Sequence, residues 1–213
     1  MRIDLFTLVP HAFAWLTEQR PIAGILGDEL ELRLFNYRDT TPLRAGQVDD
    51  EPYGGGAGMV LRVDVAAAAL DAAYGGVPEH RVIALTPQGR PLTQSVVEEL
   101  ATEETITLLS SRFEGFDERI VGHLCSDAIS IGPYVLSNGD LAAMVLLDAV
   151  ARRLPGALAE GSGELESFSA ALGGALEYPH YTRPPEFRGW TVPDVLLSGD
   201  HARIDAWRRA NVR

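Results

Sequence analysis

The central part of the chain repeats one pattern three times: a short apolar segment, a loop with glycine, and a helix-forming segment. The apolar segments are residues 81–85, 105–109 and 128–131. Short apolar strands that alternate with helices predict a mostly parallel sheet with helices on both faces. The loops after the carboxyl ends of such strands gather at one edge, where ligands bind. We therefore expect the three loops to be neighbours, although most single strand–loop–helix turns bind nothing.

Apolar periodicity predicts further elements around these three units. They are strands at residues 3–8 and 30–34 and helices at residues 11–18, 65–74, 141–154 and 201–210. Side chains that accept hydrogen bonds precede four helical segments and are expected to cap them: Asp64, Thr93, Asp140 and Asp200. Residues 37–58 are predicted to be a long polar loop, and loops of this length are usually functional or mobile.

The composition changes near residue 160 and indicates the domain organisation. Residues 1–160 carry the alternating strands and helices and are predicted to be one α/β domain. Residues 161–174 are rich in Gly, Ala, Ser and Glu and are expected to be a mobile linker. Residues 175–213 are predicted to be a small helical domain.

The formal charge of -12 argues against a protein that coats nucleic acid. The charge is uneven, because residues 183–213 hold six arginines and four acids, a net +2, and the remaining residues carry -14. All 18 basic residues are arginine, which excludes Schiff-base lysine chemistry and the lysine of a phosphate-binding P-loop. An acidic body with a mildly basic tail permits local RNA contact.

The cysteine, the histidines and the apolar segments predict no disulfide, metal site or membrane span. A single cysteine, Cys125, excludes an intrachain disulfide and is expected to be a small buried hydrophobe. The five histidines show no metal-ligand spacing, so no metal site is predicted. No apolar run is long enough for a membrane span, and the first residues lack the layout of a signal peptide, so we expect a cytoplasmic protein without membrane contact.

Six segments resemble, in order, the TrmD family of bacterial tRNA (guanine-N1)-methyltransferases, of the SPOUT class. They are DDEPYGGGAGM at 49–59, LTPQGR at 85–90, RFEGFDER at 112–119, ISIGPYVLSNGD at 129–140, HYTRP at 180–184 and VLLSGDH at 195–201. The resemblance covers nearly the whole chain. It implies that the C-terminal part of the sheet is tied into a trefoil knot, which spacing alone does not reveal.

The resemblance also implies that S-adenosylmethionine binds among the three loops. The implied contacts are Thr86, Pro87, Gln88, Gly89, Ser111, Glu114, Gly115, Ile131, Gly132, Pro133, Tyr134, Val135, Leu136 and Gly139. Backbone amides in such loops can bind an adenine edge while apolar side chains cover its faces. Ordinary loop packing is the alternative for any single residue.

Methyl transfer to guanine N1 requires a base, because a protonated N1 has no lone pair with which to attack. The family places an aspartate before Ser-Phe in the linker, and Glu166 occupies that place here. Arg152 matches a family arginine that would stabilise charge on the guanine oxygen. The alternatives are a solvated linker acid for Glu166 and, for Arg152, a favourable interaction with the helix dipole.

The resemblance implies tRNA contacts in two regions. Asp50, Tyr53, Gly55 and Gly56 would form a wall of the guanine pocket, although a flexible turn also explains these glycines. Arg183, Arg188, Arg203, Arg208 and Arg209 would contact phosphates of the anticodon stem-loop, or else lie on solvated surfaces. The family further implies a homodimer in which the linker and tail of one subunit complete the other's site.

Several residues depart from the family pattern, notably Pro133, Asn138, Ala142 and Glu166. They affect the expected rate and substrate choice more than the expected fold. The sequence therefore predicts methylation of guanine N1 at the nucleotide 3′ of the anticodon, with a non-catalytic RNA-binding or ligand-sensing relative, or a methyltransferase for another RNA, as the alternatives. Dependence on Mg²⁺ stays open.

Overall fold

A computed structural model describes residues 1–159, 162 and 166–213 of the protein. The chain divides into two compact units, Met1–Leu158 and Ala159–Arg213, which are described separately. The expected end of the first domain at residue 160, and residues 161 and 163–165 of the expected linker, lie outside the described residues. In the part of the chain that is described, no helix is both long and apolar enough to cross a bilayer.

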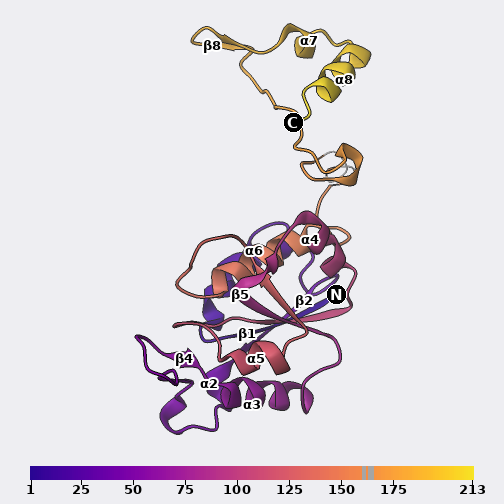
Figure 1. The fold of residues 1–213 in the computed structure, drawn as a ribbon. Helices are drawn as coiled ribbons and strands as arrows, with labels where there is room; N and C mark the ends of the chain where they lie inside the picture. Colours follow the sequence, from indigo (N-terminus) through magenta and orange to yellow (C-terminus); the bar gives the residue numbers. More distant parts are fainter. Residues whose placement is uncertain (160–161, 163–165) are drawn as a thin grey trace. The chain divides into compact units, whose positions relative to one another are not determined.

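The first unit is built on a parallel five-stranded sheet with strand order β2-β1-β6-β5-β7 (Figure 1). The strands are β1 (Arg2–Thr7), β2 (Glu31–Asn36), β5 (Arg81–Pro91), β6 (Thr105–Leu109) and β7 (Asp127–Ser130). Ile3 and Leu5 in β1 and Ile106 and Leu108 in β6 are fully buried, because helices cover both faces of the central strands. The predicted α/β class with a mostly parallel sheet is confirmed.

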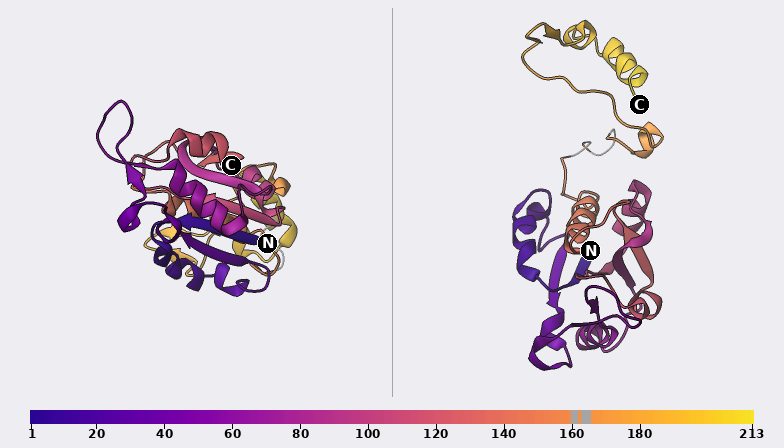
Figure 2. Two further views of the ribbon diagram at one scale, coloured as in Figure 1. Left: turned by 90° about the horizontal axis from the view of Figure 1, so that it is seen from below. Right: turned by 60° about the vertical axis from the view of Figure 1, so that its left-hand side comes forward.

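Helices flank the sheet on its two faces (Figures 1 and 2). One buried cluster packs α4 (Gln94–Ala101) and α6 (Asp140–Ala151) against the sheet, with η1 (Pro10–Phe13), α1 (Ala14–Glu18) and η2 (Ile22–Gly24). The other packs α2 (Tyr37–Thr40), α3 (Val63–Tyr74) and α5 (Glu118–His123) on the opposite face, around Phe6. The burial of both sets supplies the apolar driving force for the fold.

The predicted polar loop at 37–58 has more structure than expected. It contains α2, η3 (Arg44–Gly46) and β3 (Asp49–Asp50), and β3 pairs with β4 (Val60–Leu61) in a small antiparallel sheet. Tyr37 is fully buried, so the start of this segment belongs to the core. Polar residues around Tyr37 hide this apolar anchor from a search for periodicity.

Two of the four predicted helix caps are wrong. Arg62 and Gly139 occupy the N-cap positions of α3 and α6, and Asp64 and Asp140 lie within the first turn of these helices. The expected cap Asp140 is buried, and its Oδ1 accepts hydrogen bonds from the hydroxyls of Thr7 (2.6 Å) and Ser110 (2.7 Å). Thr93 and Asp200 are confirmed as caps of α4 and α8 (His201–Ala210).

Strand β5 continues past its predicted end at residue 85. Leu85 and Arg90 both pair with Ile129 of β7, so residues 86–89 form an irregular excursion between two pairings with the same residue. The second stretch continues with Pro91 beside Ser130, and the Leu92 N–H donates to the Ser130 carbonyl (2.8 Å). The chain therefore contacts β7 twice, on either side of the first predicted cofactor loop.

The second unit holds short elements and little buried surface. Its elements are η4 (Ala170–Leu172), the hairpin β8 (Glu186–Phe187) and β9 (Trp190–Thr191), α7 (Asp194–Leu197) and α8. Arg213, at the end of the unit, is joined to Leu176 by reciprocal backbone hydrogen bonds. Of its described residues only Ser169 is buried, so packing within this unit contributes little stability.

Candidate active site

A pocket lies at the carboxyl edge of the sheet, where the three predicted loops meet. It is lined by Leu85, Thr86, Pro87, Ser111, Arg112, Phe113, Glu114, Gly115, Ile129, Ser130, Ile131, Gly132, Tyr134, Val135, Leu136, Asn138, Gly139 and Ala142. The prediction that these loops are neighbours is confirmed. Apart from Gln88, Gly89 and Pro133, every predicted cofactor contact lines this pocket.

Short contacts hold the second and third loops together. The Gly139 N–H donates to the Ser111 carbonyl (2.8 Å), and a Cβ on Gly139 would lie 3.0 Å from the Ser110 hydroxyl. Glycine therefore permits the close approach of the two backbones. The buried carboxylate of Asp140 joins the ends of β1 and β6 to the start of α6 through Thr7 and Ser110, so the floor of the pocket is fixed by buried polar contacts.

The third loop presents apolar side chains toward the opening. Gly132 has φ +156°, and a Cβ there would collide with the ring of Tyr134. The Tyr134 ring is held by its hydroxyl, which donates to the Ile131 carbonyl (3.1 Å). Tyr134 and Val135 are 52% and 86% exposed. Exposed apolar side chains beside glycine-rich backbone suit a flat, partly apolar ligand.

Gln88 and Gly89 lie outside the pocket lining, and Gly89 has a structural role. A Cβ on Gly89 would lie less than 3.0 Å from backbone atoms of Ala128 and Ile129, because the chain crosses β7 at this point. Only glycine allows this crossing. Pro133 also falls outside the lining.

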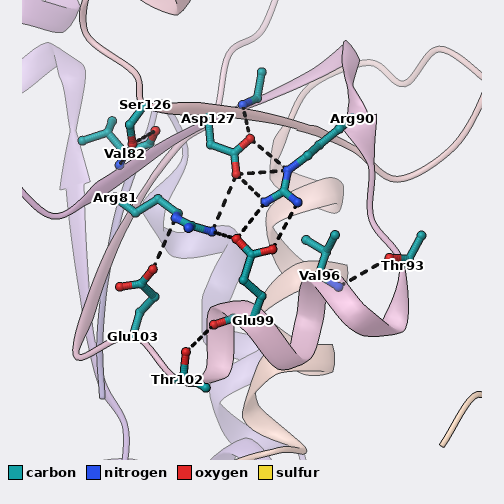
Figure 3. A network of polar contacts seen from close by, with 11 residues as sticks. Arg81, Val82, Arg90, Thr93, Val96, Glu99, Thr102, Glu103, Ser126 and Asp127 are labelled. Atoms are coloured by element: carbon teal, nitrogen blue, oxygen red, sulfur yellow. Dashed lines mark hydrogen bonds and ion pairs between the residues drawn. The ribbon is translucent and has the colours of Figure 1, made fainter. Parts of the chain in front are cut away.

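A network of ion pairs anchors the excursion at residues 86–89 (Figure 3). Arg90 donates to both carboxylate oxygens of Asp127 in β7, at 2.6 Å from Nη2 and 3.1 Å from Nε. Glu99 in α4 accepts from Arg90 (3.2 Å) and also pairs with Arg81 at the start of β5. The network joins β5, β7 and α4, and it fixes the chain just after Thr86 and Pro87 leave the pocket wall.

A second hollow lies on the other side of residues 112–119. Asp50 and Tyr53, two predicted substrate contacts, line it with Arg62, whose guanidinium bridges Asp50 (2.8 Å) and Asp64 (2.7 Å). Glu114 lines the main pocket, and its N–H donates to the Met59 carbonyl (2.9 Å). The segment that follows the glycine loop is thus a neighbour of the pocket wall.

The glycine loop at 54–58 lies open. Gly55 and Gly56 have φ +79° and +136°, and no heavy atom other than one of Pro52 comes within 4 Å of a Cβ built on them. At the end of the loop, a Cβ on Gly58 would collide with the Glu114 carboxylate, so the loop closes against the pocket wall.

Of the two predicted catalytic residues, Arg152 belongs to the first unit and does not line its pocket. Arg152 is the C-cap of α6, whose other end adjoins the pocket. At about 1.5 Å per residue, the helix places Arg152 roughly 18 Å away along its axis. Glu166 belongs to the second unit, where its carbonyl accepts from the Ser169 N–H (3.0 Å).

The predicted tRNA contacts of the tail also belong to the second unit. Arg208 lies over the ring of Tyr178, 5.2 Å from its centroid, and 3.5 Å from Asp205. Arg183 and Arg209 are exposed. Arg208 and Arg209 are both on α8, whereas Arg183 lies before the hairpin β8–β9.

Other reactive groups are accounted for by burial. Cys125 is partly rather than fully buried, and this burial raises the pKa of its thiol to about 12, so Cys125 is a poor nucleophile at neutral pH. Among the described residues no group of three or more His, Cys, Asp and Glu side chains is placed to hold a metal ion.

Seven residues that line the pocket were not among the predicted contacts: Leu85, Arg112, Phe113, Ile129, Ser130, Asn138 and Ala142. Arg112 and Phe113 begin the segment RFEGFDER at 112–119. Their position at the start of a loop that follows a strand is the signal that could have identified them as pocket residues. Asn138 caps the approach to α6, since its side chain accepts from the Asp140 N–H (3.0 Å). Ala142 lies in the first turn of α6, at the end of the helix that adjoins the pocket.

The fold and pocket define an α/β protein with a pocket at the carboxyl edge of a parallel sheet, where proteins of this class bind small ligands. Comparison with known proteins narrows this class: the chain belongs to the tRNA (guanine-1)-methyltransferase TrmD family, whose model matches residues 1–213. The family is of the SPOUT class, and the double pairing of β7 with β5 is consistent with its knotted fold.

Curated relatives match along almost the whole chain. A tRNA (guanine-N(1)-)-methyltransferase of Brevibacillus brevis is 50% identical over 98% of this chain and 85% of the relative. A protein of the same name from Dehalococcoides mccartyi is 48% identical over 98% of this chain and 84% of the relative. Another, from Geobacter sp. strain M21, is 46% identical with the same coverage.

Proposed function

We propose that this protein transfers a methyl group from S-adenosylmethionine to N1 of a guanine in tRNA, at the nucleotide 3′ of the anticodon. The observation that carries the proposal is the meeting of three loops in one pocket, in a chain that belongs to the TrmD family. The open glycine loop beside Glu114 gives the base of the substrate a place next to the pocket.

The pocket residues fit the methyl donor. Glycines at 132 and 139 lack side chains where a Cβ would meet neighbouring atoms, and Tyr134, Val135 and Leu136 offer apolar surface for an adenine ring. When bound, S-adenosylmethionine supplies an electrophilic methyl group. Thr86, Pro87 and the 111–115 loop would hold the rest of the ligand and keep water away from it.

Glu166 is proposed to take the N1 proton of guanine, so that the ring nitrogen has a lone pair for the methyl group. Arg152 is proposed to stabilise the negative charge that the guanine oxygen gains at the same step. Holding the guanine ring beside the methyl donor would also accelerate the reaction through proximity.

We further propose a homodimer in which each pocket is completed by residues of the other subunit. Two observations support it. Arg152 lies about 18 Å along α6 from the pocket of its own chain. The outward face of α6 carries Leu141 and Val145, spaced i and i+4, which are 52% and 48% exposed. The tRNA partner and a cytoplasmic location follow from the proposed substrate.

The test is methylation of unmodified tRNA transcripts with labelled S-adenosylmethionine, with and without EDTA. Label at N1 of the guanine 3′ of the anticodon, and none when that guanine is replaced by adenine, is the expected result. Cofactor binding without any label would favour a non-catalytic relative. Label elsewhere, or on another RNA only, would favour a different methyltransferase.

Glu166 stands where the family pattern has aspartate, which makes it the sharpest single test of the chemistry. Glu166→Ala is expected to lower kcat by about 10²-fold or more with little change in cofactor affinity. Glu166→Asp keeps the carboxylate and is expected to retain activity. Full activity of the alanine variant would exclude Glu166 as the base.

A further inference from the structure

The hairpin β8–β9 in the second unit exposes two aromatic side chains on one face. Phe187 and Trp190 are direct cross-strand partners, with ring centroids 5.9 Å apart and planes tilted by 56°. They are 51% and 70% exposed. Glu186 and Thr191, the next pair, face the opposite side because side chains alternate along a strand. The aromatic face is therefore separated from the hairpin's acid.

The turn of this hairpin holds an arginine in an unfavourable backbone conformation. Arg188 and Gly189 have φ +54° and +83°, the combination required by a two-residue type I′ turn. Glycine, asparagine and aspartate suit the first position, whereas a long side chain there is disfavoured. Strained positions of this kind cluster at functional sites.

The Arg188 side chain returns over the aromatic face. Its guanidinium carbon lies 5.1 Å from the centroid of the Phe187 ring. The hairpin thus combines two rings and a planar cation, and the exposed Arg183 lies shortly before it in the chain. Residues 183–213 carry a net charge of +2 within a chain of charge -12. Aromatic rings interleaved with arginine bind unstacked nucleobases and the phosphates between them.

We infer that Phe187, Arg188 and Trp190 form a stacking site for unpaired bases of the RNA substrate. This inference rests on the proposed function, since it assigns to the tRNA a contact outside the reaction pocket. Bases of a single-stranded loop can be splayed out and stack on such rings, whereas bases in a duplex are already stacked. Arg188 would stack beside them or pair with a phosphate.

The first test compares tRNA binding by Trp190→Ala and Trp190→Phe. Loss of one base stack is expected to raise the Kd for the tRNA between about five-fold and a hundred-fold, and the phenylalanine variant should recover most of the affinity. A fully base-paired RNA of equal length should bind the wild type and Trp190→Ala equally. Quenching of Trp190 fluorescence by tRNA, absent in Trp190→Phe, reports the stack directly.

Arg188→Gly provides a test in which misfolding is not an alternative explanation. Glycine relieves the strained φ, so the thermal stability should be unchanged or higher, while the affinity for tRNA should fall. Arg188→Lys keeps the charge without the planar group and should restore only part of the affinity. Arg20→Ala, at an exposed position of the first unit that is not among the predicted tRNA contacts, is the control for loss of one positive charge.

The outcomes separate this inference from the proposed function. Wild-type tRNA affinity in Trp190→Ala and Arg188→Gly would overturn the stacking site and leave methyl transfer untouched. A shift of these variants from dimer to monomer in sedimentation experiments would also overturn it, because the hairpin would then be a protein interface. Weaker tRNA binding with unchanged S-adenosylmethionine affinity supports it, even if the methylated position proves to be a different one.

Discussion

Gly89 shows how a single missing side chain determines this architecture. The backbone of β7 occupies the space where a Cβ would lie, so no rotation of a side chain can relieve the collision. Glycines in the open loop at 54–56 meet no such backbone. The two kinds of glycine are indistinguishable in sequence, but they have different consequences when they are replaced.

Gly89→Ala is expected to destabilise the protein by about 1–3 kcal/mol, the usual cost of overpacking, and to weaken S-adenosylmethionine binding. Urea denaturation and calorimetric titration with the cofactor measure the two effects. Gly122→Ala in α5 is the matched control: its Cβ meets nothing within 4 Å, and alanine favours a helix by up to about 1 kcal/mol. Equal stability of both variants would contradict a tight crossing at Gly89.

Buried polar groups connect the strands at the other end of the sheet. Asp4 in β1 is fully buried and accepts two hydrogen bonds from Arg33 of β2 and one from Tyr74 of α3, each 2.6 Å long. Burial by itself raises the pKa of the Asp4 carboxyl, but the hydrogen bonds and charge of Arg33, with the Tyr74 hydroxyl, lower it below its usual value. The ionised form is therefore part of the folded state.

Asp4→Asn is expected to lower the free energy of unfolding by about 2–3 kcal/mol at pH 7, because Arg33 loses its counter-charge. A lowered folded-state pKa gives stability that is present above the unfolded pKa of about 3.9 and is lost as the pH falls. The difference between wild type and variant should therefore shrink below about pH 4. Denaturation curves across pH 3–7 test this, and a constant difference would contradict it.

The ion pairs of Arg90 join β5, β7 and α4, and we expect them to hold the wall of the cofactor pocket in place. Arg90→Ala frees the excursion that carries Thr86 and Pro87, so the Kd for S-adenosylmethionine is expected to rise several-fold. Because Arg90 is 38% exposed, the loss of stability should be limited to about 1 kcal/mol. Arg119→Ala, which breaks the exposed pair with Asp117 at 2.6 Å, should leave cofactor affinity unchanged. A double-mutant cycle with Asp127→Ala should show coupling in cofactor binding.

Local pattern explains which parts of the fold were predictable. The strands at 105–109 and the helix caps Thr93 and Asp200 depend on neighbours in sequence, and they are where the sequence places them. Asp140 was expected to be a cap, but its partners Thr7 and Ser110 are 133 and 30 residues away, and only the folded sheet brings them together. The close approach of Gly89 to the backbone of Ala128 and Ile129 is likewise created only by the fold, so the sequence predicted Gly89 as a ligand contact and gave no sign of this crossing.

At the scale of the whole molecule, the proposed exchange of residues between subunits can be tested with mixed dimers. Glu166→Ala lacks the proposed base, and Leu136→Asp places a charge in the apolar pocket, so each variant alone should be inactive. In a dimer with one chain of each kind, the Glu166→Ala chain has the intact pocket and the Leu136→Asp chain has the intact Glu166. This pocket is therefore active only if Glu166 acts on the pocket of the other subunit. An equal mixture should then regain about a quarter of wild-type activity, since half the dimers hold one working site.

A mixture that stays inactive would show that Glu166 serves the pocket of its own chain. Sedimentation of the mixed sample, with one variant carrying a tag of different mass, confirms that heterodimers have formed. Mixing Glu166→Ala with wild type controls for inhibition by the variant chain.

The double pairing of Ile129 with Leu85 and Arg90 has a consequence for biosynthesis. A ribosome that has made the first cofactor loop has not yet made the strand against which both ends of that loop are held. A nascent chain stalled before residue 127 therefore has no floor for its pocket, however well its earlier strands have paired. The pocket lining is complete only when the chain has been made as far as Ala142, so we expect binding of the methyl donor to begin in one step at that stage of synthesis.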